Sequence, residues 1–229
     1  MNTVLHGLSP TVADRVVERL RQLGISTLFG VHGANAEDIF DATVRHPGIT
    51  PVIAKHEFAA GAMADGAARI GGGVSAVLTT SGGGALNVVP ALAEAYDSRV
   101  PVLALLGTAP RPTVGRGGFQ DMLTPPDTID LAAVLSGVVG AYAVVDDPGA
   151  LDGAFTAVTD ALRRGLPAAL VIPKDVQAAP APDVATTSPP HPRRAAEPAP
   201  DDLAERLAEL AGPGRVCVWA RGGTSRPRV

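Results

Sequence analysis

The sequence has few aromatic residues, a single cysteine and no long apolar run. Aromatic residues make up 3% of the 229 positions although 46% are hydrophobic. The core must therefore consist of Val, Leu, Ile and Ala, the usual composition of parallel sheets covered by helices. The one cysteine, Cys217, excludes an internal disulfide framework, and the Cys/His spacing of a metal site does not occur. We therefore predict a protein of the reducing cytoplasm, without metal ligands of its own.

Neither charge nor hydropathy indicates a nucleic-acid or membrane partner. The formal net charge is -4, which gives no basic field for nucleic acid. The N-terminus lacks the charged region and apolar core of a secretion signal, and no apolar run approaches the roughly 18 residues that cross a bilayer. The remaining partner classes are small molecules and other polypeptides.

Short β-type runs alternate with helical patterns as far as about residue 175. This alternation is typical of βαβ units. We predict an α/β fold, a doubly wound six-stranded parallel sheet with helices on both faces, whose ligands bind beyond the carboxyl ends of the strands. The expected strands are 27–31, 50–54, 75–80, 101–107, 141–145 and 168–172, and the expected helices after the first are 35–45, 57–70, 84–97, 127–136 and 149–164.

The first helix is expected in "SPTVADRVVERLRQLG" (9–24). Ser9 is the predicted N-cap, Pro10 the first helical residue, and Gly24 the residue that ends the helix. One face of this helix carries its apolar residues, which are Val12, Val16, Val17, Leu20 and Leu23.

The composition changes after residue 176. Residues 177–200 are rich in Pro, Ala, Ser and Thr and lack apolar periodicity, which predicts an exposed linker. Residues 201–229 contain one amphipathic segment and one strand-like segment, too little to bury a core. We therefore expect one domain over 1–176 and, after the linker, the incomplete start of a further domain or a C-terminal tail.

Four loops follow predicted strands and should meet at one edge of the sheet. They are "GVHGANAED" (30–38), "AKHEFAAG" (54–61), "TSGGGALN" (80–87) and "GTAPRPTVGRGGFQD" (107–121). Each also has a structural explanation. Glu57 could stabilise the start of its own helix, His32 could be a hydrogen-bonded structural residue, and Gln120 could be solvated. The three glycines form neither a Walker loop nor G-x-G-x-x-G, so they indicate a phosphate site only weakly.

A resemblance changes the balance between these alternatives. The order and spacing of "LFGVHG", "AKHEFAAGAMADGAARIGG", "TTSGGGALNVVPALAEAYDSRVPVLALLG", "FQD" and "AALVIPKDV" resemble the pyrimidine-binding domain of thiamine-diphosphate enzymes of the acetolactate synthase and 2-oxo acid decarboxylase family. The similarity runs from about residue 9 to 176. The His-Gly pair and the Gly-Gly-Gly run are closest to benzaldehyde lyase and related acyloin ligases.

The resemblance implies a role for each candidate residue. Glu57 would hydrogen-bond N1′ of the cofactor's aminopyrimidine and favour the tautomer that deprotonates the thiazolium. Gly83 and Gly84 would approach the pyrimidine ring, and Asn87 would help to hold that loop. His32 would contact the substrate oxygen or shuttle a proton, and Gln120 would hydrogen-bond the substrate carbonyl.

The resemblance also implies a neighbouring chain. The Ala- and Gly-rich helix after Glu57 is expected to pack against that chain, as in the family's dimers. The small residues expected to allow this are Ala59, Ala60, Gly61, Ala62 and Ala64.

The motifs of the family's other half are absent from the sequence. Neither Gly-Asp-Gly nor a later Asn-Asn pair, which bind Mg²⁺ and the diphosphate in such enzymes, occurs here. We expect a partner chain to hold the diphosphate and Mg²⁺, in a heterodimer or heterotetramer. A truncated piece of a longer protein is the competing explanation.

The leading functional hypothesis is one subunit of a split thiamine-diphosphate enzyme that forms or cleaves C–C bonds next to a carbonyl. Such a lyase or transferase would act on a 2-oxo acid or aldehyde, and only with its partner chain. A 2-oxo acid decarboxylase subunit is one alternative, and a non-catalytic regulatory or scaffolding subunit is another. A nucleotide-binding module is disfavoured, because no G-x-G-x-x-G follows the first strand.

Overall fold

The computed structural model describes residues 9–118, 120–122, 128–181, 205–206 and 208–209. Within these ranges no helix combines the length and the apolar character that a membrane span requires. The predicted linker and the segment after it, including Cys217, fall almost wholly outside the described residues.

Six parallel strands form one sheet in the described part of the chain, as predicted. The strands are β1 (Thr27–Gly30), β2 (Thr50–Ile53), β3 (Ser75–Thr79), β4 (Val102–Thr108), β5 (Ala141–Val144) and β6 (Ala168–Pro173). Their order across the sheet is β2-β1-β3-β4-β6-β5. The central strands β3, β4 and β6 are buried along their whole length, because helices cover both of their faces.

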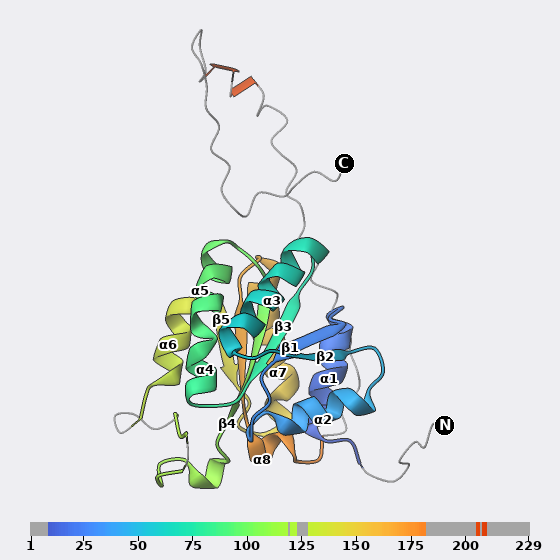
Figure 1. Cartoon of the computed structure of the whole chain (residues 1–229), viewed down its shortest axis with the longest axis vertical. Coiled ribbons are helices and arrows are strands. Elements are labelled where there is room, and N and C mark those ends of the chain that lie inside the picture. Colours follow the sequence, from blue (N-terminus) through green and yellow to red (C-terminus); the bar gives the residue numbers. More distant parts are fainter. Residues whose placement is uncertain (1–8, 119, 123–127, 182–204, 207, 210–229) are drawn as a thin grey trace.

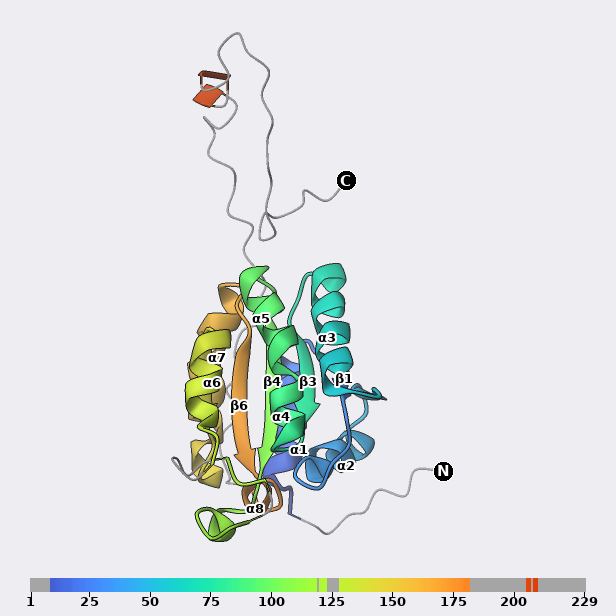
Figure 2. The same cartoon turned by 60° about the vertical axis from the view of Figure 1, so that its left-hand side comes forward.

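Helices cover both faces of this sheet (Figures 1 and 2). One core lies between the sheet and α1 (Val12–Gln22), α2 (Glu37–Arg45) and α7 (Leu151–Arg163). The opposite core lies under α3 (Glu57–Gly71), α4 (Gly83–Asn87), α5 (Val89–Asp97) and α6 (Leu131–Val138). The short helix α8 (Lys174–Gln177) follows β6, and 3₁₀ turns occupy Arg111–Thr113 and Pro148–Ala150. The predicted doubly wound α/β architecture is confirmed.

The start of the first helix differs from the prediction. Thr11, rather than Ser9, is the N-cap, and its side chain and that of Asp14 form a reciprocal capping box. The residues before it are extended, because Pro10 and Thr11 pair with the chain around Pro180 in an isolated antiparallel bridge. Pro10 therefore precedes the helix instead of opening it. The predicted apolar face is confirmed, since all five of its residues are buried.

The predicted helix over 84–97 is two helices, α4 and α5, that meet at Val88. Pro90 lies in the first turn of α5. It has no backbone N–H with which to continue the hydrogen bonds of α4, but the first turn of a new helix accepts it. The break at Val88 turns the chain after the glycine-rich loop.

The packed unit continues past residue 176. Gln177 is fully buried and donates hydrogen bonds to the carbonyls of Asn35 and Ile172, both at 2.8 Å. Gly107 makes this approach possible, because a Cβ there would lie 1.6 Å from the Asn35 carbonyl oxygen. The loop after β1, the end of β4 and helix α8 are thereby packed together at the carboxyl edge of the sheet.

Candidate active site

The candidate residues lie at the carboxyl ends of four neighbouring strands. Strands β2, β1, β3 and β4 are adjacent in the sheet, so the loops that follow them lie side by side. The fold therefore brings together the four loops that the sequence singles out, at the edge where open parallel sheets bind their ligands.

Glu57 is the first residue of α3 and is buried, with 8% of its surface exposed. It is not the cap of its helix: that position belongs to His56, whose Nδ1 accepts a hydrogen bond from the Phe58 amide at 3.2 Å. The Glu57 carboxylate is instead engaged by Asn87, whose Nδ2 donates to Oε2 at 3.1 Å. A buried carboxylate near a helix N-terminus is favourably placed, since the helix dipole and free amides stabilise negative charge there.

Gly84 lies against the other oxygen of this carboxylate. A Cβ at position 84 would lie 3.2 Å from Glu57 Oε1 and 2.8 Å from Thr80 Cγ2. Any larger residue would press on both neighbours. Gly83, by contrast, is exposed and a Cβ there would meet nothing within 4 Å. The first group of site residues is thus Glu57, Gly84 and Asn87, which belong to α3 and α4.

A second group connects three loops through hydrogen bonds. Asn35, from the loop after β1, donates from Nδ2 to Ser81 Oγ at 2.6 Å. Ser81, from the loop after β3, donates to Gln120 Oε1 at 3.1 Å. Asn35 and Ser81 are buried, and Gln120 is partly exposed.

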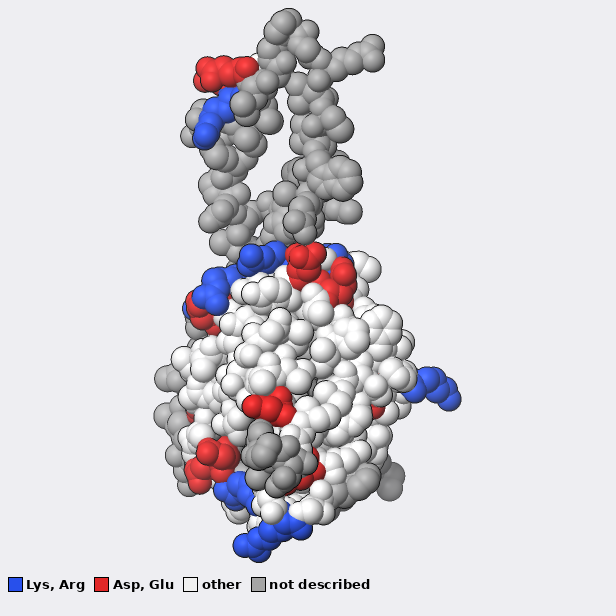
Figure 3. All heavy atoms as spheres, turned by 90° about the vertical axis from the view of Figure 1, so that its left-hand side faces the viewer, with Lys and Arg blue, Asp and Glu red and all other residues white. Residues whose placement is uncertain are grey.

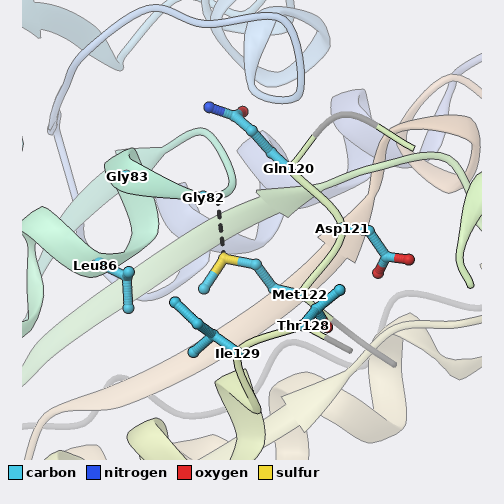
Figure 4. A pocket seen from close by; sticks show the side chains of 8 residues that line it. All are labelled: Gly82, Gly83, Leu86, Gln120, Asp121, Met122, Thr128 and Ile129. Carbon is cyan, nitrogen blue, oxygen red and sulfur yellow. Dashed lines mark hydrogen bonds between the residues drawn. The ribbon is translucent and has the colours of Figure 1, made fainter. Parts of the chain in front are cut away.

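A pocket of about 580 Å³ opens beside this second group (Figure 4). It is lined by Gly82, Gly83, Leu86, Gln120, Asp121, Met122, Thr128 and Ile129. The Gly82 amide donates to Met122 Sδ at 3.0 Å, which fastens the loop after β4 to the glycine-rich loop. The pocket is thus walled by the glycines on one side and by the residues around Gln120 on the other.

His32 belongs to neither group. It is exposed, and its ring stacks on that of Phe40 in α2, with centroids 5.7 Å apart and planes 24° from parallel. The imidazole remains accessible at the same edge of the sheet, but the structure does not bring it into contact with Glu57 or Gln120.

Ion pairs hold the rim of the site around β6. Lys174 pairs with Glu37 and Asp38 at the start of α2. The hydrogen bond from Lys174 lowers the pKa of Glu37, and these two carboxylates raise the pKa of Lys174 against the opposing effect of burial. Lys174 and Glu37 therefore stay charged at neutral pH, and the ion pairs tie the start of α2 to the start of α8.

The part of the chain that the structure describes contains no group of three or more His, Cys, Asp or Glu side chains arranged to hold a metal ion. The polar centre of the first group is therefore the buried Glu57 carboxylate with the Asn87 amide that holds it. A buried, oriented carboxylate of this kind can hydrogen-bond a ring nitrogen.

Sequence reasoning missed Asn35, Thr80 and Ser81. All three lie in loops that were recognised, but their roles depend on hydrogen bonds between loops, which the sequence does not display. Their one sequence signal is position, since each is a small polar residue that follows a buried strand.

A family of known proteins matches the part of the chain that carries this site. The family model "Thiamine pyrophosphate enzyme, N-terminal TPP binding domain" matches residues 10–131. This range includes all of the candidate residues in both groups. Thiamine pyrophosphate is another name for thiamine diphosphate.

Several acetolactate synthases are similar to the chain. Acetolactate synthase 1, chloroplastic, of Oryza sativa subsp. japonica is 33% identical over 214 residues, covering 92% of this chain and 32% of the relative. Acetolactate synthase, chloroplastic, of Arabidopsis thaliana is 31% identical over 214 residues, covering 92% and 31%. The acetolactate synthase isozyme 3 large subunit of Escherichia coli (strain K12) is 40% identical over 109 residues, covering 48% and 19%. The chain spans about a third of the length of the plant relatives.

Proposed function

Because the chain belongs to the thiamine pyrophosphate enzymes, through the N-terminal TPP binding domain of that family, we propose that it is the pyrimidine-binding subunit of an enzyme that forms or cleaves C–C bonds next to a carbonyl. The cofactor supplies a carbon nucleophile and an electron sink for such reactions. A 2-oxo acid or an aldehyde is the proposed substrate. This chain's part is to bind the pyrimidine half and to place protein groups around the reacting carbonyl.

The observation that carries the proposal is the environment of Glu57. Asn87 holds Oε2, so the carboxylate has a fixed orientation, and Oε1 faces the position where Gly84 lacks a side chain. We propose that a ring nitrogen of the cofactor hydrogen-bonds this oriented carboxylate. Burial excludes water from the carboxylate, which strengthens a hydrogen bond made there. The proposed role of Glu57 is to hold and exchange the proton on that nitrogen.

We assign the substrate side to Gln120 and His32. Gln120 lines the pocket and offers an amide that can donate to a carbonyl oxygen. His32 is exposed at the neighbouring strand end, from where its imidazole can give or accept a proton. In this proposal Gln120 orients the substrate and His32 moves a proton at the substrate oxygen.

The diphosphate and Mg²⁺ are proposed to be held by a second chain. The described residues offer no acidic cluster for a metal ion, so these groups need other ligands. The surface is suited to a partner: the face over α4, α5 and α6 carries few charged side chains across its middle, and charges gather along its edges (Figure 3). Large apolar side chains are also exposed on the helices of this side, namely Phe58, Met63, Ile70 and Tyr96. A heterodimer or heterotetramer is the assembly we propose.

The test is to express the chain with the reading frame beside its gene, purify the complex and titrate thiamine diphosphate with Mg²⁺ by calorimetry, using each chain alone as a control. We expect binding by the complex only. Activity is then assayed with 2-oxo acids and aldehydes, and the products are identified. Accumulation of an acyloin indicates ligation, whereas a free aldehyde from an oxo acid indicates the decarboxylase alternative.

The decisive variant is Glu57→Gln in that complex. Loss of a proton-transfer group should lower kcat by about 10²-fold or more. Glu18→Gln is the matched control, because Glu18 lies on α1, on the opposite face of the sheet, and pairs with Arg15 at the surface. We expect Glu18→Gln to keep kcat within twofold. Full activity of Glu57→Gln would refute the assigned role, and absence of cofactor-dependent activity in any complex would favour a scaffolding subunit.

A further inference from the structure

We infer that Ser81 and Asn35 are positioning residues that fix the direction in which Gln120 presents its amide. The inference rests on the proposed function in one respect, since the oriented amide is the one assigned to the substrate carbonyl. The hydrogen-bond chain itself is a property of the fold.

The direction of the chain follows from which end of each amide faces Ser81, together with the single proton that a serine hydroxyl can donate. Ser81 Oγ accepts from Asn35 Nδ2 at 2.6 Å and has one proton of its own to donate. It donates that proton to Gln120 Oε1 at 3.1 Å. The carbonyl end of the Gln120 amide is therefore occupied, and its NH₂ group has no partner among the described residues. Gln120 thus presents a hydrogen-bond donor, which suits a carbonyl or carboxylate ligand and disfavours a ligand that donates.

Asn35 is itself anchored on three sides. Its main-chain N–H donates to Thr80 Oγ1 at 3.3 Å. Its main-chain carbonyl oxygen accepts from Gln177 Nε2 at 2.8 Å and lies against Gly107. These contacts, with the loop after β3, with α8 and with β4, hold the main chain of Asn35 in place. The hydrogen-bond chain from Asn35 to Gln120 therefore starts at a residue whose main chain is held in place.

The backbone at Gln120 is also held in an unusual conformation. Gln120 has φ = 60°, in the left-handed region that residues other than glycine seldom adopt. Such a conformation persists where neighbouring contacts hold it. Gly82, with φ = 61°, makes room for the side chain, because a Cβ there would lie 2.7 Å from Gln120 Cγ. The loop is also held by the Gly82–Met122 hydrogen bond, and Figure 4 shows the Gln120 amide pointing away from Met122.

The first test is nuclear magnetic resonance on the 229-residue chain itself. The sequence contains three glutamines and three asparagines, so its side-chain amide signals are few, and Gln120→Ala identifies the Gln120 pair by its disappearance. In the natural protein we expect an order parameter for the Gln120 Nε2–H bonds close to that of rigid backbone, about 0.85. In Ser81→Ala it should fall below about 0.6. Asn35→Ala should lower it less, because Ser81 still reaches Gln120.

Ser75→Ala is the matched control for Ser81→Ala. Ser75 is a buried serine at the opposite end of β3, so the substitution removes the same hydroxyl away from the site. We expect it to leave the Gln120 signals unchanged. A Gln120 amide that is already mobile in the natural protein would overturn the inference, and that measurement does not depend on any variant folding.

The second test is kinetic and uses the active complex. Ser81→Ala should raise KM for the carbonyl substrate about five- to tenfold, the value of one hydrogen bond, and change kcat less. In a Gln120→Ala background the same substitution should have no further effect, because its target is gone. An additive effect there would overturn the inference. If Ser81→Ala loosens the amide but leaves the kinetics unchanged, the positioning stands and the role assigned to Gln120 is wrong.

Discussion

Gly84 is the residue at which packing and the proposed chemistry constrain each other most closely. Thr80 and Glu57 both lie within contact distance of the space that a side chain at position 84 would fill. The glycine therefore serves the close packing of α4 on α3, and it lets the Glu57 carboxylate keep the orientation that Asn87 gives it. A substitution at Gly84 should therefore affect stability differently from one at Gly83, where a side chain would meet nothing within 4 Å.

Gly84→Ala should lower the free energy of unfolding by about 1–3 kcal/mol, because the new methyl group overpacks a buried contact. Gly83→Ala is the matched control: its methyl group meets nothing within 4 Å, and alanine in a helix is favoured over glycine by up to about 1 kcal/mol. Urea denaturation of both variants measures the difference. If the Gly84→Ala and Gly83→Ala proteins are equally stable, the loop around Thr80 moves to accommodate the new methyl group, and the packing at Gly84 is not tight.

At this scale the sequence predicts residue types better than it predicts contacts. Glu57, Gly84 and Asn87 were singled out, and the structure brings these three together. Ser81 and Asn35 were not, because a hydrogen bond between two loops depends on a tertiary arrangement that no local pattern encodes. The contact of His32 with Phe40 has the same origin, since β1 and α2 lie next to each other only in the folded chain.

Among the elements, α1 and α2 show how a single carboxylate joins two helices. Asp14 Oδ2 accepts from the amide and the hydroxyl of Thr11, at 2.9 and 2.8 Å, at the start of α1. Its Oδ1 accepts from Arg45 Nε and Nη2 at 3.0 and 2.8 Å and lies 3.0 Å from His46 Nε2, at the end of α2. Burial alone would raise the pKa of Asp14, but the hydrogen bonds from Thr11 and Arg45 outweigh it and lower the pKa below 3.8.

The lowered pKa predicts how stability depends on pH. A carboxyl group whose folded pKa lies below its unfolded pKa stabilises the protein above the unfolded value, near pH 4, and loses this contribution as pH falls through the folded value. Asp14→Asn should therefore cost about 1–2 kcal/mol at pH 7, a value similar to that of other capping interactions, and progressively less below pH 4. Chemical denaturation at several pH values measures this.

The control for that experiment is Asp41→Asn, which makes the same change of charge on the exposed side of α2. We expect a difference from the natural protein of less than about 0.5 kcal/mol at every pH. A constant effect of Asp14→Asn across the whole pH range would show that its carboxylate charge is not what stabilises the α1–α2 contact.

The elements themselves follow closely from sequence patterns. Continuous apolar runs predicted the six strands, and the period of the apolar residues predicted the helices, because burial on one or two faces leaves a local signature. The ends were less predictable. The start of α1 depends on pairing with Pro180, which lies far along the chain, and the break at Val88 depends on how Pro90 enters a new helix. A contact of long sequence separation decided the start of α1, whereas the break at Val88 has a local cause, Pro90, that the apolar pattern does not reveal.

At the scale of the whole molecule, helix α3 has one face that packs within the chain and another that is exposed and available to a partner. Of its five small residues that were expected to meet a neighbouring chain, Ala60, Gly61 and Ala64 are instead buried within this chain. A Cβ at Gly61 would lie 2.6 Å from Ala91 Cβ, so these small residues serve the close approach of α3 and α5. The other two, Ala59 and Ala62, are half-buried and exposed, respectively, and the exposed part of α3 also includes Met63 and Ile70.

This outer face is where we expect the second chain to bind. Met63 and Ile70 are seven residues apart, two turns of a helix, so they share one side, and both are exposed apolar residues that water solvates poorly. A partner that covers them removes apolar surface from water, and a charge placed there would have to be desolvated with no counter-charge. Met63→Asp should therefore weaken assembly at least tenfold, measured by sedimentation of the chain with its co-expressed partner.

The control has to place the same charge on an exposed apolar residue elsewhere. Val44 meets this condition, since it is 81% exposed on α2, on the opposite side of the sheet. Val44→Asp should leave assembly unchanged and should alter the folding of the chain no more than Met63→Asp does, which circular dichroism checks. If Val44→Asp is the variant that dissociates the complex, the partner binds the face of α1 and α2. The pyrimidine site on the α3 side would then have to be completed by a copy of this chain, because a chain on the far face of the sheet could not contribute groups to Glu57.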